Sequence, residues 1–484
     1  MLEDTDSYKF LGVPECIEHD TPILTNKLVE NIESRANVTW SSPLSDFNKV
    51  TSTNTFVNST TEYFFWSEKF RLEDLRKMDI SVRKGIVKHG AKHYQQLNSL
   101  LYLPKTLGGR GLRCFERTYK ETKIKAAVKL LETKDERIKL VRKFNLVCMK
   151  SKHSSIFKDA ISYAGEMNLT LRIDECSYDM TFESNEGPIT TDSIEVIKGQ
   201  LKKRRNEQLE FEVLDTTWQG LNFQYRKEDP HLHQGCYDWL KGWQNVPSYI
   251  VRDIYDLYCQ TLNTKTFQLI RSETPPSDTS CRLCKNGNES VMHILNRCEK
   301  LRTRPYTKRH DEGFLCFFNE LLLKLGFISN CPPWFSQSKP KPFYNNEVAN
   351  IWWDIPEFSG AADDNDGERL LRPDGKVMLK AEKKIFLLEI TISWIDNRGA
   401  RYKEKVDKYA AIRRNLQRDE PDYIVDQITL VMDSLGGYSQ DLRDNIGKVL
   451  GERKVVDRVI RKMQKSVLNN SVHVSRCFKL EAGI

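Results

Sequence analysis

The sequence predicts a mixed α and α/β protein: a helical N-terminal part, then a zinc knuckle, then a mixed β-sheet flanked by helices. Three observations lead to this prediction. Residues 65–131 repeat apolar side chains at helical spacing, a cluster of Cys and His begins at Cys281, and two apolar strands and a helix succeed one another within residues 370–409. Because these features lie far apart in the chain, we expect several domains.

Composition narrows the class of protein. A chain of 484 residues has room for about three domains. Its 75 Lys and Arg exceed its 67 Asp and Glu, and the net charge of +8 fits a polyanionic partner. No apolar run is long enough to span a membrane, and the acidic start of the chain is unlike a signal peptide. Most of the 12 Cys are scattered, which favours a reducing compartment over a disulfide framework.

The N-terminal half reads mainly as helices and loops. Residues 30–60 are rich in Asn, Ser and Thr and are predicted to form a loop. Helices are predicted over 71–78, 80–93 and 117–132, with a glycine-rich loop at 108–111, and two more helices between 237 and 270. Residues 134–235 are polar and receive no assignment. Within them, the basic run 202–205 is expected to be a solvated helix face, with a nuclear-localisation signal as the alternative.

The Cys and His cluster has the spacing of a zinc site. Cys281, Cys284, His293 and Cys298 form the pattern C-x2-C-x8-H-x4-C. Zn²⁺ binds four sulfur or nitrogen ligands in a tetrahedron, and a site with four protein ligands is structural. The alternative is three buried Cys and a core His that meet by coincidence. We predict a structural zinc knuckle.

Basic residues follow the knuckle directly. They are Arg302, Arg304, Lys308, Arg309 and His310. Clustered cations next to a zinc module are typical of contacts with phosphate groups. We therefore expect this segment to bind nucleic acid.

Two carboxylates stand out further along the chain. Residues 372–375 (RPDG) are predicted to form a tight turn, and residues 385–392 a strand that is covered on both faces. Glu389 lies inside this strand, where an unpaired carboxylate would be costly. A hairpin would bring Asp374 close to Glu389, and two converging oxygen ligands suit Mg²⁺.

A cation should join these acids from the helix that follows Gly399. Tyr402, Lys405 and Tyr409 recur at spacings of three and four residues and therefore share one helical face. Lys405 is expected to point inward with this face, and Lys408 to flank it. The alternative for each of the three charged residues is a purely structural role.

The rest of the C-terminal part gives five further predictions. Residues 346–354 are expected to form a helix, 359–368 an acidic loop, 427–432 a strand, and 440–449 and 454–468 two helices. Ala362-Asp363-Asp364 is unlike a polymerase Asp-Asp pair because it lacks a hydrophobic hairpin around it.

Together these residues resemble the C-terminal part of reverse transcriptases from non-long-terminal-repeat retrotransposons of the restriction-like-endonuclease class. The knuckle followed by Arg309-His310 matches this family, and so does the order Asp374, Glu389, Lys405. Leu101-Tyr102-Leu103-Pro104, with the glycine-rich loop, is similar to its thumb, and residues 8–12 are similar to the segment after its polymerase palm. The resemblance covers most of the chain.

The resemblance implies a fold, a reaction and a site. The C-terminal part would be a variant of the PD-(D/E)xK fold that nicks target DNA. Asp374 and Glu389 would bind Mg²⁺, and Lys405 with Lys408 would supply the catalytic cations. Target DNA and element RNA would be the partners, and the nucleus the place of action. The implied segments are a palm-end remnant with a loop (1–60), a helical thumb (61–150), a helical linker (151–270), the knuckle (271–312) and the endonuclease (313–484).

The chain departs from the family in three places. Glu389 stands where the family usually has Asp, and Thr391 stands where the general motif has Lys, so the Lys must come from the following helix. No polymerase palm motif precedes Tyr8, so reverse transcription by this chain alone is not expected. The alternative function is that of a non-catalytic nucleic-acid-binding remnant or a domesticated protein.

Overall fold

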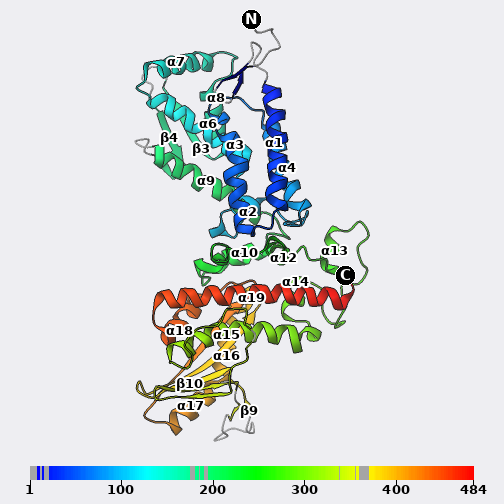
Figure 1. Ribbon diagram of the computed structural model, residues 1–484, viewed down its shortest axis with the longest axis vertical. Coiled ribbons are helices and arrows are strands. Elements are labelled where there is room, and N and C mark those ends of the chain that lie inside the picture. Colours follow the sequence, from blue (N-terminus) through cyan, green and yellow to red (C-terminus); the bar gives the residue numbers. More distant parts are fainter. Residues whose placement is uncertain are drawn as a thin grey trace. The chain divides into compact units, whose positions relative to one another are not determined.

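The computed structural model shows a mostly helical α/β chain that divides into two compact units. It describes residues 8–10, 13–15, 21–174, 180–184, 186–189, 194–336, 338–354, 356–358 and 370–484. Unit 1 comprises residues 1–216 and 244–249, and unit 2 comprises 217–243 and 250–484. The predicted mixed α and α/β class is confirmed (Figure 1). The division into five segments is finer than these two units and stays a prediction.

Unit 1 is a helical bundle with small sheets. Its strands are β1 (Tyr8–Phe10), β2 (Val13–Glu15), β3 (Leu169–Ile173), β4 (Met180–Ser184) and β5 (Gly187–Ile189). Its helices are α1 (Thr21–Ser41), α2 (Asp46–Ser52), η1 (Thr53–Asn58), α3 (Ser59–Glu62), η2 (Phe64–Trp66), α4 (Leu72–Lys88), α5 (Ser99–Tyr102), η3 (Lys105–Leu107), α6 (Phe115–Glu132), α7 (Glu136–Lys150), α8 (Ile156–Glu166) and α9 (Ile194–Leu214).

The prediction of a loop over residues 30–60 is wrong, because α1, α2 and η1 occupy most of it. Leu28, Ile32, Ala36 and Trp40 recur every four residues along α1 and are buried in the core that α1 shares with α4. This apolar stripe outweighs the polar composition. The two helices predicted over 71–93 are one helix, α4.

Unit 2 contains the larger sheet and the cluster of Cys281, Cys284, His293 and Cys298, which we call the zinc cluster after the ion that it could hold. Its strands are β6 (Phe343–Asn345), β7 (Ala349–Trp353), β8 (Glu357–Phe358), β9 (Leu370–Leu371), β10 (Gly375–Leu379), β11 (Lys384–Ser393) and β12 (Ile424–Asp433). Its helices are α10 (Leu221–Glu228), η4 (Gln234–Tyr237), α11 (Trp239–Gly242), α12 (Ser248–Tyr258, which begins in unit 1), α13 (Lys265–Arg271), α14 (Val291–Asn296), η5 (Glu299–Leu301), η6 (Arg302–Tyr306), α15 (Thr307–Lys324), η7 (Ile395–Asn397), α16 (Arg398–Lys408), α17 (Ala410–Asp419), α18 (Gln440–Leu450) and α19 (Arg453–Ala482).

The sheet of unit 2 is mixed and has helices on both faces. Its strand order is β12-β11-β10-β7-β6, and the pairing of β11 with β12 is parallel, whereas the other pairs are antiparallel. Phe386, Leu388 and Ile390 pack into the core formed with α15 and α19. Leu387 packs instead against Tyr409 at the junction of α16 and α17. The prediction that this strand is covered on both faces is therefore confirmed.

The helix predicted over 346–354 is wrong, because this segment contains strand β7. Asn346 closes a turn before it by accepting hydrogen bonds from the backbone N–H groups of Val348 and Ala349, at 2.9 and 2.8 Å. Ile351 and Trp352 then pair with both β6 and β10. Pairing on two sides favours the extended conformation of these bulky residues.

The remaining C-terminal elements largely match the prediction. Strand β12 and helix α18 lie where they were predicted, and α19 runs on to Ala482. The predicted acidic loop at 359–368, including Asp363 and Asp364, lies outside the described residues. No helix in the described ranges combines the length and apolar character that a membrane crossing requires.

Candidate functional site

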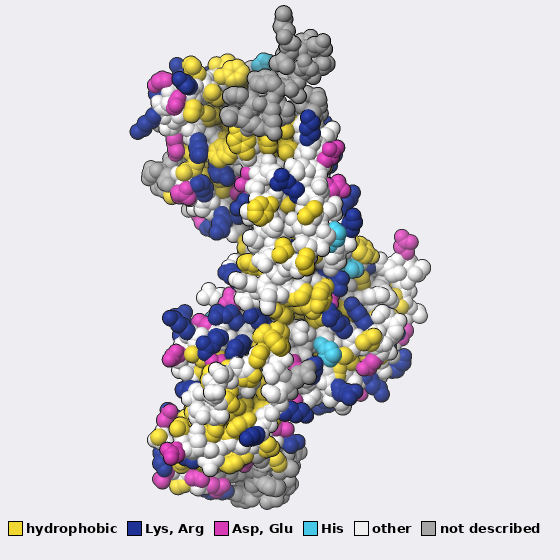
Figure 2. Space-filling view, viewed as in Figure 1, with side chains coloured by type: hydrophobic (Ala, Val, Ile, Leu, Met, Phe, Trp, Pro, Cys, Tyr) yellow, Lys and Arg dark blue, Asp and Glu magenta, His cyan; other side chains and the backbone are white. Residues whose placement is uncertain are grey.

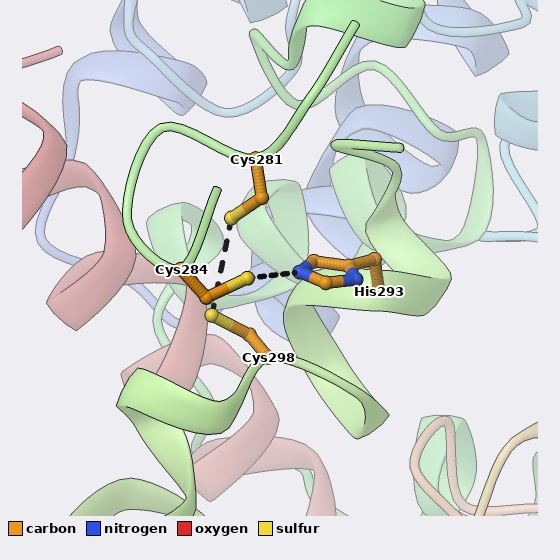
Figure 3. A group of neighbouring side chains, drawn as sticks. All are labelled: Cys281, Cys284, His293 and Cys298. Atoms are coloured by element: carbon orange, nitrogen blue, oxygen red, sulfur yellow. Dashed lines mark hydrogen bonds between the residues drawn. The ribbon is translucent and has the colours of Figure 1, made fainter. Parts of the chain in front are cut away.

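The four predicted zinc ligands converge on one point (Figure 3). Their ligating atoms all lie within 4.8 Å of one another. The sulfurs of Cys281 and Cys298 are 3.9 Å apart, and Cys284 Sγ is 3.3 Å from His293 Nε2. Zn–S bonds near 2.3 Å would place two tetrahedral sulfurs about 3.8 Å apart. The cluster could therefore hold a zinc ion.

The backbone at Gly287 helps the four side chains of the cluster to meet. Gly287 has a φ of +71°, which only glycine adopts without strain, and a Cβ there would lie 3.3 Å from His293 Nδ1. Burial, together with the charges of Cys281 and Cys284, raises the pKa of the Cys298 thiol to about 12. A bound Zn²⁺ would remove such protons, because the thiolate is the form that ligates.

Glu289 is a structural residue of this cluster that the sequence did not reveal. It is fully buried, and its carboxylate accepts hydrogen bonds from the backbone N–H groups of Lys265 (2.9 Å) and Arg282 (2.8 Å). The Arg282 guanidinium lies 3.3 Å from the same carboxylate. Glu289 thereby joins α13 to the loop that carries the first two cysteines.

The zinc cluster is also tied to the sheet. Asn296, at the end of α14, donates a hydrogen bond of 3.3 Å to the carbonyl of Ile392 in β11. Arg309 donates to the carbonyl of Leu295 (2.7 Å) and to Ser471 Oγ of α19 (3.3 Å). Arg309 is only 2% exposed, so it braces this junction and does not extend from the surface as predicted.

The register of the sheet places Asp374 beside Glu389. Gly375 pairs with Leu388 at the end of the β10–β11 ladder, and the next pair in this register would be Asp374 with Glu389. Asp374 Oδ2 accepts a hydrogen bond of 2.7 Å from the backbone N–H of Ile390. The two carboxylates therefore come from neighbouring strands, as the hairpin argument expected.

Lys405 and Glu389 form an ion pair. Glu389 is 3% exposed, and its Oε1 contacts Lys405 Nζ. Its Oε2 is buried and accepts no hydrogen bond from the described residues. The nearby Tyr409 hydroxyl lowers the pKa of Glu389. Burial and then the charge of Asp374 raise the pKa of Glu389, against the opposing effect of Lys405. The predicted acidic, acidic and cationic side chains are thus brought together.

Lys408 has a different environment from Lys405. Its Nζ donates a hydrogen bond of 2.9 Å to the Tyr409 hydroxyl and lies 4.7 Å from the centre of that ring. The Tyr409 hydroxyl in turn donates to the carbonyl of Arg372 at 3.0 Å. Within the described residues, Lys408 therefore reaches the site through Tyr409.

His310 lies next to Asp374. Its Nε2 is 3.3 Å from Asp374 Oδ2, and its Nδ1 is 3.0 Å from Asp311 Oδ1. Burial opposes the charged imidazole, but the two carboxylates outweigh burial and raise the pKa of His310 to about 10. Sequence analysis assigned His310 to phosphate contact and missed Asp311, whose only signal is its position next to His310.

Asp354 is a further carboxylate of this region that sequence analysis missed. It directly follows β7, and its backbone N–H donates to the carbonyl of Asp374 at 3.0 Å. Burial, followed by the charges of Asp374 and Asp311, raises its pKa, whereas Arg372 acts in the opposite direction. Several negative charges therefore gather at this end of the sheet.

Two further interactions hold α16, and with it Lys405, in position. Gln427 Nε2 donates a hydrogen bond of 2.9 Å to the carbonyl of Lys405. At the start of α16, Arg398 contacts the fully buried Asp433, which also lies 3.2 Å from Arg226. These partners are distant in sequence, and no spacing pattern could have indicated them.

A basic cleft adjoins the site. Its volume is about 580 Å³, and it lies between the zinc cluster, α15, the end of β11 and α16. Arg297, Arg302, His310, Arg401 and Lys405 contribute to its lining. Of the other predicted phosphate contacts, Arg304 is exposed and Lys308 lies 3.8 Å from Glu312.

Comparison of the chain with models of known protein families and with curated proteins gives no match.

Proposed function

We propose that unit 2 is a Mg²⁺-dependent DNA endonuclease of the restriction-like, PD-(D/E)xK type. Asp374 and Glu389 bind the metal ion, and Lys405 acts on the attacking water or on the phosphate. The observation that supports this most strongly is Glu389, a buried acid beside a second acid, with one oxygen that accepts no hydrogen bond from the described residues. Lys405 contacts one oxygen of Glu389, and the other buried oxygen costs folding free energy unless a second cation binds it.

The surrounding groups fit phosphodiester hydrolysis. Hard carboxylate oxygens are the ligands that Mg²⁺ prefers, and the bound ion supplies Lewis-acid activation of the phosphate. Lys405 is held by Glu389 at the edge of the basic cleft, where it can orient water or stabilise developing negative charge. Arg297, Arg302 and Arg401 give the cleft the charge that a DNA backbone requires.

The zinc cluster has a supporting role in this proposal. Zn²⁺ at the four ligands would fix the segment that carries Arg297 and Arg302 against β11. Such a closed site has no open coordination position for a substrate. The order of the knuckle, the cations and the acidic site also supports the nicking portion of a retrotransposon reverse transcriptase, with target DNA and element RNA as partners in the nucleus.

A non-catalytic nucleic-acid-binding protein is the second candidate. The observation that favours it is His310, whose imidazole lies 3.3 Å from Asp374 and so places a positive charge at a carboxylate that should bind metal. In this candidate the cleft binds nucleic acid and His310 permanently neutralises Asp374.

A plasmid-nicking assay separates the two candidates. Wild type and Asp374→Ala are compared on supercoiled DNA with and without Mg²⁺, and Asp422→Ala removes an exposed carboxylate of the same unit as a control. The proposal expects Mg²⁺-dependent nicking by wild type and the control but not by Asp374→Ala. Equal nicking by all three would contradict it, and salt-dependent binding without nicking would favour the second candidate.

A further inference from the structure

A row of cations along α19 is not used by the proposed nuclease site. Lys454, Arg458, Arg461 and Lys465 follow one another at spacings of four, three and four residues and therefore lie on one face of the helix. We call them the α19 stripe. With a rise of 1.5 Å per residue the stripe is about 16 Å long. Figure 2 shows Lys and Arg side chains gathered over this end of α19.

The stripe carries more positive charge than its surroundings neutralise. Glu320 uses one oxygen for Arg458 and the other for Lys462, which lies 3.0 Å away. Within the described part of the chain, Arg461 and Lys465 have no carboxylate partner. Burial and then the charges of Arg461 and Lys462 lower the pKa of Lys465. Lys465 is half-buried, whereas Lys454, Arg458 and Arg461 are exposed and open to an anionic partner.

Aromatic rings adjoin the stripe. The side chain of Arg461 lies over Gly242, where a Cβ would be 3.0 Å from its Cδ. The next residue, Trp243, packs edge-to-face on Trp334 with ring centres 5.3 Å apart, and Trp334 packs on Phe335 at 5.5 Å. Phe335 is 63% exposed. Phe335 is therefore the exposed end of a row of packed aromatic rings that begins at the residue after Gly242, where the Arg461 side chain lies.

We propose that the α19 stripe and Phe335 form a docking surface for single-stranded nucleic acid. Phosphates lie along the cations, and an unpaired base stacks on the Phe335 ring, which a base inside a duplex cannot do. Duplex DNA would contact the cations alone. The surface is separate from the Asp374–Glu389 site and does not depend on nuclease activity.

The test measures binding of labelled oligo(dT), oligo(U) and a duplex of equal length to the full chain by fluorescence anisotropy. The stripe variant is Arg461→Gln with Lys465→Gln. The matched control is Arg414→Gln with Lys479→Gln, which removes two cations elsewhere in unit 2. We expect the stripe variant to weaken single-strand binding about tenfold and to lower its salt slope by about 1.4, with a much smaller effect of the control.

Phe335 supplies the second variant. Phe335→Ala should weaken single-strand binding roughly fivefold or more without changing the salt slope, and Phe335→Trp should retain it. Wild-type single-strand affinity in the stripe variant or in Phe335→Ala would overturn the proposal, and so would equal losses on duplex and single strands for Phe335→Ala. Loss of one of the two oligonucleotides but not the other would identify DNA or RNA as the strand that binds. Nicking by these variants should stay at the wild-type level, so this result is independent of the nuclease proposal.

Discussion

Asp433 and Glu389 are both buried carboxylates of unit 2, and they lie in adjacent strands, yet their surroundings differ. Asp433 contacts Arg226 and Arg398 and also accepts hydrogen bonds of 2.9 Å from the backbone N–H groups of Leu435 and Gly437. Glu389 contacts Lys405 through one oxygen, and its other oxygen accepts no hydrogen bond from the described residues.

The contrast between Asp433 and Glu389 indicates which buried carboxylate is structural and which is functional. A carboxylate with every oxygen satisfied contributes to the fold, and removing its charge exposes its partners to desolvation. A buried carboxylate that is under-satisfied and next to another acid lowers stability as it stands, so its presence needs another explanation. Substitutions at the two kinds of carboxylate should therefore have different effects on stability and activity.

The zinc cluster, like Asp433, is expected to be structural, because a bound ion would use all four ligating side chains. Zinc removal by a chelator, or Cys281→Ser, should unfold the segment around residues 281–298. Structural zinc in small peptides contributes about 10–16 kcal/mol, so this should be the largest loss of stability. Metal analysis should find one zinc per chain in wild type and none in the variant. A chain that lacks zinc and keeps its full stability would contradict the assignment.

Asp433→Asn should destabilise unit 2 by about 3–5 kcal/mol, because it leaves two buried guanidinium groups without a counter-charge. Asp426→Asn is the matched control in the same strand, since Asp426 forms an exposed pair with Lys448 at 3.3 Å; it should cost about 1 kcal/mol or less. Urea unfolding measures both. Equal losses of stability for the two substitutions would contradict the structural role of the buried Asp433.

Glu389→Gln should leave stability unchanged or raise it by about 1 kcal/mol, since it removes a buried charge and its repulsion with Asp374. Lys405, whose side chain is 21% exposed, can still reach water after the substitution. Urea unfolding under the conditions used for Asp433→Asn gives the comparison directly. A loss as large as that of Asp433→Asn would make Glu389 a structural residue.

The same two carboxylates should show opposite dependence on pH. Burial alone would raise the pKa of Asp433, but Arg226 and Arg398 outweigh burial and lower it, so its contribution is present above the ordinary pKa of 3.8 and is lost as pH falls through the lowered value. The pKa of Glu389 is raised, so its folded state releases the proton later than its unfolded state. The protonated form of Glu389 therefore stabilises the folded state at low pH, and this stabilisation is lost as pH rises from the ordinary pKa of 4.5 through the raised value.

Unfolding titrations at several pH values measure this difference. The free energy of unfolding of Glu389→Gln should increase relative to wild type as pH rises above about 4.5 and then level off. A difference that does not change with pH would show that Glu389 titrates as an ordinary exposed acid.

The smallest effect is expected for Lys408, which contacts Tyr409 and not the carboxylates. Lys408→Ala should lower nicking by less than about tenfold and stability by about 1 kcal/mol or less. Lys405→Met should lower nicking by about 100-fold or more. A larger loss of nicking for Lys408→Ala than for Lys405→Met would show that Lys408, and not Lys405, acts in catalysis.

Local patterns allowed the sequence to predict part of this site. The spacing of Cys281 to Cys298 predicted the zinc cluster, because all four ligands lie in one short segment. Helical spacing predicted that Lys405 faces inward, and strand pattern predicted the position of Glu389. These predictions depended on neighbours that lie few residues apart.

Long-range contacts explain what the sequence could not predict. Asp433 and Arg226 are 207 residues apart, and His310 meets Asp374 only because α15 packs across the end of β11. The loop predicted over residues 30–60 was wrong because polar composition was given more weight than the four-residue repeat of α1. Tertiary packing decides such cases.

Mg²⁺-dependent nicking by Glu389→Gln shows whether this carboxylate binds the catalytic metal ion. The variant is compared with wild type on supercoiled plasmid, after urea unfolding has shown that both are equally folded. We predict that Glu389→Gln is at least as stable as wild type and that its nicking rate is lower by about 100- to 1,000-fold. Nicking at the wild-type rate by a fully folded Glu389→Gln variant would contradict the assignment of this carboxylate to the metal ion.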